Sequence, residues 1–109
     1  FTGLNITNGL PVAEDGVIEI GWRIAPEFWG KVYVTEAARR WRDIGLDDLG
    51  LDRLISFAVA DNHRSTAVMR RIGMTPRPGL DFDHPIVPAT HPHLKRHVFY
   101  EMLPGDPRG

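Results

Sequence analysis

The sequence contains no cysteine and no long apolar run, and its charges almost cancel. Without cysteine the chain cannot form a disulfide, a thiolate metal site or a cysteine nucleophile, and we expect a reducing, cytoplasmic location. No apolar run approaches the ~20 residues that span a bilayer, so a membrane partner is not expected. The 13 basic and 14 acidic side chains leave a formal charge of −1, which argues against non-specific electrostatic binding to nucleic acid.

The residues that are present predict one folded domain. Of the 109 residues, 42% are hydrophobic and 25% are charged, as in ordinary globular chains. The pattern of residues 1–6 predicts a strand that starts at the first residue, with no polar segment before it. We therefore expect residues 1–109 to form a single, partial domain that begins inside a larger fold and ends in a flexible tail at 104–109.

The spacing of hydrophobic residues distinguishes expected strands from expected helices along the chain. Alternating apolar residues such as Ile18, Ile20 and Trp22 predict a strand, and apolar residues three and four apart predict a helix. The expected strands are 1–6, 17–24, 54–60 and 96–103, and the expected helices are 31–44 and 62–72. The order β-β-α-β-α-β predicts an α/β domain with a mixed sheet. The proline-rich stretch 76–92 is expected to be irregular.

The segment from Ile20 to Ala38 has the pattern of a phosphate-binding turn. A strand leads through Trp29-Gly30-Lys31 into a helix that lacks a conventional capping side chain. The unpaired amides at such a helix start suit an anionic group, and glycine lets the backbone approach it closely. Many strand–turn–helix units contain a glycine, so this pattern alone leaves the ligand open.

Two linked motifs carry a resemblance to a known family. The run Glu19-Ile-Gly-Trp-Arg-Ile-Ala-Pro-Glu-Phe-Trp-Gly-Lys-Val-Tyr-Val-Thr-Glu-Ala37 resembles the acetyl-CoA segment of the GNAT superfamily, in its RimJ/RimL-like branch. The later Asn62-His-Arg-Ser65, followed by a helix that ends at Gly73-Met74, resembles the second signature of that branch. The motifs stand in the family's order, and the resemblance covers residues 1 to about 103.

This resemblance implies a GNAT-like fold, here its C-terminal portion, and an N-acetyltransferase activity. Acetyl-CoA would be the co-substrate, without a metal, and its acetyl group would move by direct attack to a primary amine of a protein N-terminus or a small molecule. Main-chain atoms near Ile24 would pair with the pantetheine arm, and Asn62 would reach that arm or the thioester. Ser65 would be the general acid at the leaving thiolate. The pyrophosphate would lie on the turn and helix start formed by Trp29, Gly30, Lys31, Val32, Tyr33, Val34 and Thr35.

Two departures from the family pattern favour an alternative, a non-catalytic GNAT-like module that binds coenzyme or a partner. Val32 stands where the family has a glycine, and a β-branched side chain carries bulk toward a phosphate. We expect Val32→Gly to bind acetyl-CoA more tightly than the natural sequence does. The opening strands and helices that wall the family's acceptor site are also not in this sequence.

Each candidate residue also has a plainer interpretation. Asn62 and Ser65 could serve only as a helix cap and a first-turn hydroxyl. Glu19 is the carboxylate best placed to act as a general base, yet it could equally be a solvated or salt-bridged strand residue. Zinc-ligand residue types occur at Asp81, Asp83, His84, His91, His93 and His97, but their spacing is irregular and no metal is expected.

The expected first strand also bears on assembly. A strand at the edge of an incomplete sheet presents unpaired backbone groups to a second copy. We therefore expect residues 1–6 to promote a homo-oligomer.

Overall fold

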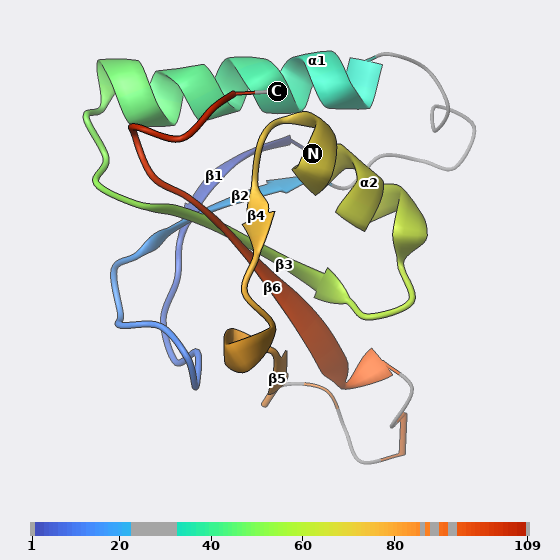
Figure 1. The fold of residues 1–109 in the computed structure, drawn as a ribbon. Helices are drawn as coiled ribbons and strands as arrows, with labels where there is room; N and C mark the ends of the chain where they lie inside the picture. Colours follow the sequence, from blue (N-terminus) through green and yellow to red (C-terminus); the bar gives the residue numbers. More distant parts are fainter. Residues whose placement is uncertain (1, 23–32, 86, 88–89, 92–93, 109) are drawn as a thin grey trace.

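The computed structural model describes residues 2–22, 33–85, 87, 90–91 and 94–108 (Figure 1). The strands are β1 (Thr2–Ile6), β2 (Ile18–Trp22), β3 (Leu54–Val59), β4 (Thr75–Pro76), β5 (Phe82–Asp83) and β6 (Arg96–Met102). The helical segments are α1 (Tyr33–Asp43), the π-helix η2 (Ile44–Asp48), α2 (His63–Arg71) and the 3-10 turn η3 (Pro78–Leu80). The longer elements follow the predicted order, and β4, β5 and η3 lie in the stretch that was expected to be irregular.

The described strands form one mixed sheet, as predicted. Its order is β1-β2-β3-β6-β4, with β5 paired to β6. The pairing of β2 with β3 is parallel, and the other pairings are antiparallel. Figure 1 shows α1 and α2 above the same side of this sheet.

The two faces of the sheet bury separate apolar clusters. On the helix face, Ile20 and Trp22 pack with Val34 of α1 and Met69 of α2, as the alternation in β2 predicts. On the other face, a smaller cluster forms around Ile55, Phe82 and Phe99. None of the helices in the described part of the chain has the length and apolar character needed to cross a membrane.

The helical segment after α1 differs from the prediction. Gly45 does not end it, because the chain continues as the π-helix η2 to Asp48. A side chain at Gly45 would meet Leu51 at 3.3 Å and Leu4 at 3.5 Å. Gly45 therefore packs against Leu51 and β1 within a continuous helical segment.

The segment that follows β6 docks on α1 and η2. Arg108 donates to both carboxylate oxygens of Asp47 at 2.7 Å and to Asp43 at 3.0 Å, which lowers the pKa of Asp47. Arg42 of α1 is buried and donates to the carbonyls of Arg108 at 2.6 Å and Ile72 at 2.9 Å. The described part of the expected tail, residues 104–108, thus forms a docked segment that contacts α1 and η2 through Arg108.

Candidate functional site

The central feature of the site is the point where two parallel strands part. The ladder between β2 and β3 includes Ile18 with Leu54 and Glu19 with Ile55, and continues no further in the described residues. Beyond it, the hydroxyl of Ser56 donates to the carbonyl of Ile20 at 2.8 Å. Backbone groups alternate between the two edges of a strand, so Trp22 directs its N–H and C=O toward the same gap as Ile20.

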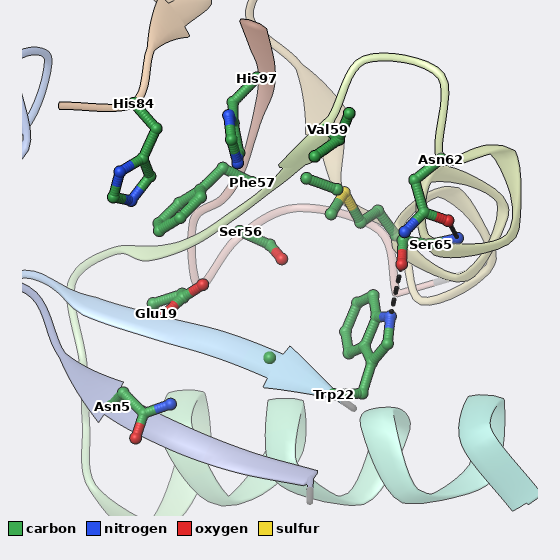
Figure 2. Close-up of a pocket in the computed structure, with 13 residues that line it drawn as sticks. Asn5, Glu19, Trp22, Ser56, Phe57, Val59, Asn62, Ser65, His84 and His97 are labelled. Carbon is green, nitrogen blue, oxygen red and sulfur yellow. Dashed lines mark hydrogen bonds between the residues drawn. The ribbon is translucent and has the colours of Figure 1, made fainter. Parts of the chain in front are cut away.

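A cavity of about 630 Å³ occupies this gap (Figure 2). Strand alternation assigns its lining residues to both faces of the sheet. Trp22 and Ser56 belong to the helix face, whereas Glu19, Phe57 and His97 belong to the opposite face. The full lining is Asn5, Glu19, Gly21, Trp22, Ser56, Phe57, Ala58, Val59, Asn62, Ser65, Met69, His84 and His97.

On the helix face, the start of α2 forms what we call the hydroxyl end of the cavity. The side chain of Asn62 accepts a hydrogen bond from the amide of Ser65 at 3.2 Å, so the predicted helix cap is confirmed. The indole of Trp22 donates to the Ser65 hydroxyl oxygen at 3.3 Å, and both residues are buried. A hydroxyl that accepts a bond keeps its own proton, so Ser65 can still donate to a ligand.

On the opposite face, two imidazoles form what we call the histidine end. The ring centroids of His84, just after β5, and His97 of β6 lie 5.1 Å apart. Both rings contact Phe57 and Phe82 at centroid distances of 5.6–6.0 Å. Partial burial, and secondarily the nearby His97, lowers the pKa of His84 below its ordinary 6.5, so this end favours neutral imidazole.

Glu19 contributes a carboxylate to the same face of the sheet as the two histidines. It pairs with Asn5 across β1 and β2, and both residues line the cavity. Figure 2 places the Glu19 side chain below Phe57 and Ser56 in the gap. The structure thus brings the two predicted catalytic candidates, Glu19 and Ser65, into the lining of one cavity.

The predicted coenzyme residues divide into two groups. Ile24, Trp29, Gly30, Lys31 and Val32 lie outside the described residues. The first residues of α1 are described: Tyr33 is 61% exposed, Thr35 is partly buried and Val34 is packed in the core. The side chain of Val34 points into the core, so a phosphate at the start of α1 would contact the backbone amide of Val34 and not its side chain.

Two of the candidate zinc ligands, His84 and His97, are the pair at the histidine end. Asp81 accepts from the amide of Phe99 at 2.9 Å, and Asp83 lies 3.7 Å from Arg96. His93 lies outside the described residues. Across the residues that are described, no three side chains of the His, Asp and Glu types gather as a possible metal site.

Several residues of the cavity lining were not among the predicted site residues. Trp22 was expected only as a core residue, although its indole N–H also reaches Ser65. His97 was expected only as a possible metal ligand, and Phe57 only as part of an apolar strand. Their common signal is strand parity: Phe57 alternates with Ser56 on β3, and His97 pairs with Val59 across β3 and β6.

Comparisons with known proteins agree with this architecture. The family model described as Acetyltransferase (GNAT) domain matches residues 3–75. The chain is 36% identical to the N-acetyltransferase YdaF of Bacillus subtilis over 85 residues, 78% of this chain and 44% of that protein. It is 39% identical to the FsC-acetyl coenzyme A-N(2)-transacetylase of Aspergillus fumigatus over 57 residues, 52% of this chain and 24% of that protein.

Solved structures show the same fold. A GNAT family acetyltransferase from Bacillus anthracis superimposes with a TM-score of 0.71 at 25% identity, covering 93% of this chain and 57% of that one. An acetyltransferase from Agrobacterium tumefaciens gives a TM-score of 0.66 at 29% identity, covering 93% and 50%. The chain thus spans about half the length of these structures and less than half of the curated relatives. The family model, the parted strands and the shared fold together establish that the chain belongs to the GNAT acetyltransferase family.

Proposed function

We propose that this protein transfers an acetyl group from acetyl-CoA to a primary amine. The observation that carries the proposal is the parting of β2 from β3 beyond Glu19 and Ile55, with Ser65 in the gap. A strand edge that faces a cavity offers backbone groups to an extended ligand. The amide bonds of a pantetheine arm have the donors and acceptors that such an edge requires.

The coenzyme would lie on the helix face of the sheet. Its pantetheine arm would follow the edge of β2 at Trp22 and continue toward Ile24. Its pyrophosphate would lie at the start of α1, on the turn that the sequence predicts from Trp29 to Val32 and on the amides of Tyr33, Val34 and Thr35. Helix starts of this kind favour anions because their first amides are unpaired and the helix dipole is positive there.

The transfer would take place between the two ends of the cavity. Ser65 would donate its proton to the leaving thiolate, because Trp22 fixes its oxygen by a bond that leaves the proton available. Asn62 would orient the pantetheine or the thioester from the capping position. Glu19, on the opposite face, would receive the ammonium group of the acceptor. Direct attack requires no covalent enzyme intermediate, and the sequence has no cysteine to form one.

The class of amine has two candidates. The Bacillus relative YdaF is named as a ribosomal N-acetyltransferase, and the Aspergillus relative is named as an FsC-acetyl coenzyme A-N(2)-transacetylase. A ribosomal protein N-terminus would agree with the RimJ/RimL-like motifs and with a cytoplasmic location. A small-molecule amine is the alternative, and an acceptor panel should contain both.

The first test measures binding and transfer separately. We expect CoA to bind to the chain in calorimetry, and acetyl-CoA to release thiol when an amine acceptor is added. Ser65→Ala should reduce thiol release about 10- to 100-fold, within the usual range for a general acid, and should bind CoA within threefold of the natural sequence. Thr75→Ala, on the exposed β4, is the matched control.

The outcomes of this test separate three cases. Absence of CoA binding would contradict the proposal as a whole. CoA binding without thiol release, for a peptide and a polyamine alike, would instead favour the non-catalytic coenzyme-binding module. Normal thiol release by Ser65→Ala would remove Ser65 as the acid and leave the transfer itself intact.

We also propose that the protein self-associates through β1. In the described residues β1 is the edge of the sheet, and Ile6 at its end is 67% exposed. Pairing with a second copy would cover this edge. Sedimentation at several concentrations should show a species larger than the monomer, and a monomer at all concentrations would contradict it.

A further inference from the structure

The histidine end of the cavity holds chemistry that the proposed transfer has not yet used. His84 and His97 come from positions 13 apart in the sequence and meet on the face of the sheet opposite the helices. Both line the same cavity as Ser65 and Trp22. An acceptor amine that approaches from this face would pass the two imidazoles before it reached the gap between β2 and β3.

The hydrogen bonding of His97 defines which of its nitrogens can accept a proton. Its Nδ1 lies 2.9 Å from the carbonyl oxygen of Lys95. A carbonyl can only accept, so Nδ1 carries the hydrogen of this bond. In the neutral ring the lone pair is then on Nε2. Figure 2 shows the His97 ring directed from β6 into the cavity, with a nitrogen at its far end.

The surroundings hold the His97 ring in this orientation. The side chain is buried, and its ring stacks on Phe82 at 5.6 Å with an interplanar angle of 24°. Phe57 closes the third side at 6.0 Å. A base whose ring is fixed by packing and by a backbone acceptor meets the geometric requirement for proton transfer better than a freely rotating side chain does.

The charged and titratable groups around His97 come from each neighbouring element. His84 after β5 and Glu19 on β2 line the cavity with His97, whereas Asp83 and Arg96, 3.7 Å apart, belong by strand alternation to the other face of the sheet. The lowered pKa of His84 keeps that ring neutral near pH 7, since burial penalises its charged form and His97 adds to the effect. One proton can therefore be accepted at this end without a second positive imidazole beside it.

We infer that His97 is the general base of the transfer and that its Nε2 takes a proton from the acceptor ammonium. The inference rests on the proposed function. The acceptor R–NH3⁺ gives one proton to Nε2 and becomes R–NH2, whose electron pair then attacks the thioester carbonyl. The C–N bond forms, the C–S bond breaks, and the thiolate receives a proton from Ser65. The attacking nitrogen loses a second proton as the amide forms; this proton restores the Ser65 hydroxyl, and the imidazolium returns its own to solvent.

Glu19 has a different part in this scheme. A carboxylate has an ordinary pKa near 4.3 and an imidazole near 6.5. The imidazole is therefore the better matched base for an amine at neutral pH. Glu19 would instead attract the ammonium form and hold it at the histidine end. Loss of Glu19 should then weaken acceptor binding, whereas loss of His97 should slow the proton transfer.

Two substitutions, one at His97 and one at Glu19, separate the base from the residue that holds the amine. In His97→Asn the amide nitrogen occupies the position of Nδ1 and can still donate to the Lys95 carbonyl, but nothing replaces Nε2. We expect kcat/KM to fall about 10²- to 10⁴-fold, the usual contribution of a general base, and the histidine limb of the pH–rate profile to disappear. Glu19→Gln should raise the KM for the amine and keep that limb. His91→Asn, outside the cavity, is the matched control.

A purely structural role for His97 makes the opposite prediction. It would leave His97→Asn close to the natural sequence in rate and in pH profile, and this result would overturn the inference. The probes are acetyl-CoA with a short peptide that has a free N-terminal alanine, and acetyl-CoA with spermidine. Calorimetry with CoA on every variant shows separately whether the proposed function itself has failed.

A second measurement does not depend on turnover. Long-range ¹H–¹⁵N correlation spectra report which nitrogen of each imidazole carries the proton. We expect the Nδ1–H tautomer for neutral His97, and the same tautomer in the presence of CoA. The Nε2–H tautomer would remove the lone pair from the cavity and overturn the inference, even if CoA bound normally.

Discussion

The two ends of the cavity are built in different ways. The hydroxyl end is local: Asn62 and Ser65 stand three positions apart at the start of one helix, and Trp22 adds a single long-range bond. The histidine end is assembled from β3, β5 and β6, with Phe57, His84 and His97 far apart in the sequence. The first therefore depends on helix formation, and the second depends on correct strand pairing.

The largest change in stability should come from a substitution of Gly73. This residue follows the C-terminus of α2, the helix whose start forms the hydroxyl end. Its φ is +92°, and a Cβ there would lie 2.5 Å from the carbonyl oxygen of Pro107. We expect Gly73→Ala to reduce the free energy of unfolding by about 2–4 kcal/mol, from backbone strain and steric overlap. Chemical denaturation measures this change.

Two control glycines separate the causes of that loss. Gly50 has a φ of +62°, and no atom lies within 4 Å of the place that a Cβ would take, so Gly50→Ala should cost only about 1 kcal/mol of strain. Gly79 has neither feature, so Gly79→Ala should be nearly neutral. Equal losses at Gly73 and Gly50 would show that the docked 104–108 segment does not restrain α2.

The next effect concerns Ser56, which links β3 to β2 where the two strands part. Its hydroxyl donates to the Ile20 carbonyl where the strands part, and the side chain is 1% exposed. Ser56→Ala leaves a buried acceptor without its donor, which costs about 1–3 kcal/mol. Thr7→Ala is the control, because the carbonyl of Val17 also accepts a hydrogen bond from the Thr7 amide and so keeps a donor. This variant should therefore lose less free energy of unfolding than Ser56→Ala. Denaturation curves that coincide for the two variants would contradict a special role of the Ser56 bond.

A smaller effect isolates the hydroxyl end. Asn62→Ala removes the cap of α2 and should reduce the free energy of unfolding by about 1 kcal/mol. The preceding residue, Asp61, is also of a type that caps helices, but the structure gives the capping bond to Asn62. Asp61→Ala should therefore be neutral within about 0.5 kcal/mol. The reverse order of the two variants in thermal unfolding would be inconsistent with the described cap.

The smallest effect concerns the histidine end and pH. The pKa of His84 is lowered in the folded state, so below about pH 6.5 the unfolded chain binds more protons at this residue. Folding stability should therefore fall as the pH drops below 6.5, down to the lowered folded value. His84→Gln should reduce this acid sensitivity relative to His91→Gln. Parallel stability–pH curves for both variants would show that His84 is not the cause.

The sequence predicted the hydroxyl end because its signals are local. A cap three positions before a first-turn serine, and a glycine after the last apolar residue, are physical requirements of one helix, and Asn62 and Gly73 meet them. The strand alternation in β2 likewise placed Ile20 and Trp22 in the core. Each of these patterns acts within a single helix or strand.

The histidine end could not be predicted in the same way. His97 pairs with Val59, and His84 contacts it only because the short β5 pairs with β6. Prolines around Phe82 made this stretch look irregular, although a two-residue strand is enough to fix the register. The burial of Arg42 likewise depends on residues far along the chain, since its acceptors are the carbonyls of Ile72 and Arg108.

The lining of one cavity by both faces of the sheet has a kinetic consequence. In the proposed transfer, acetyl-CoA would enter the cavity beside α1 and the amine would enter beside β5. Because the two entrances are separate, neither substrate has to leave before the other binds. Within the proposed transfer, initial-rate lines for the two substrates should therefore intersect and not run parallel. The separation of two strands over a few residues thus creates one cavity that two substrates could reach from opposite faces of the sheet.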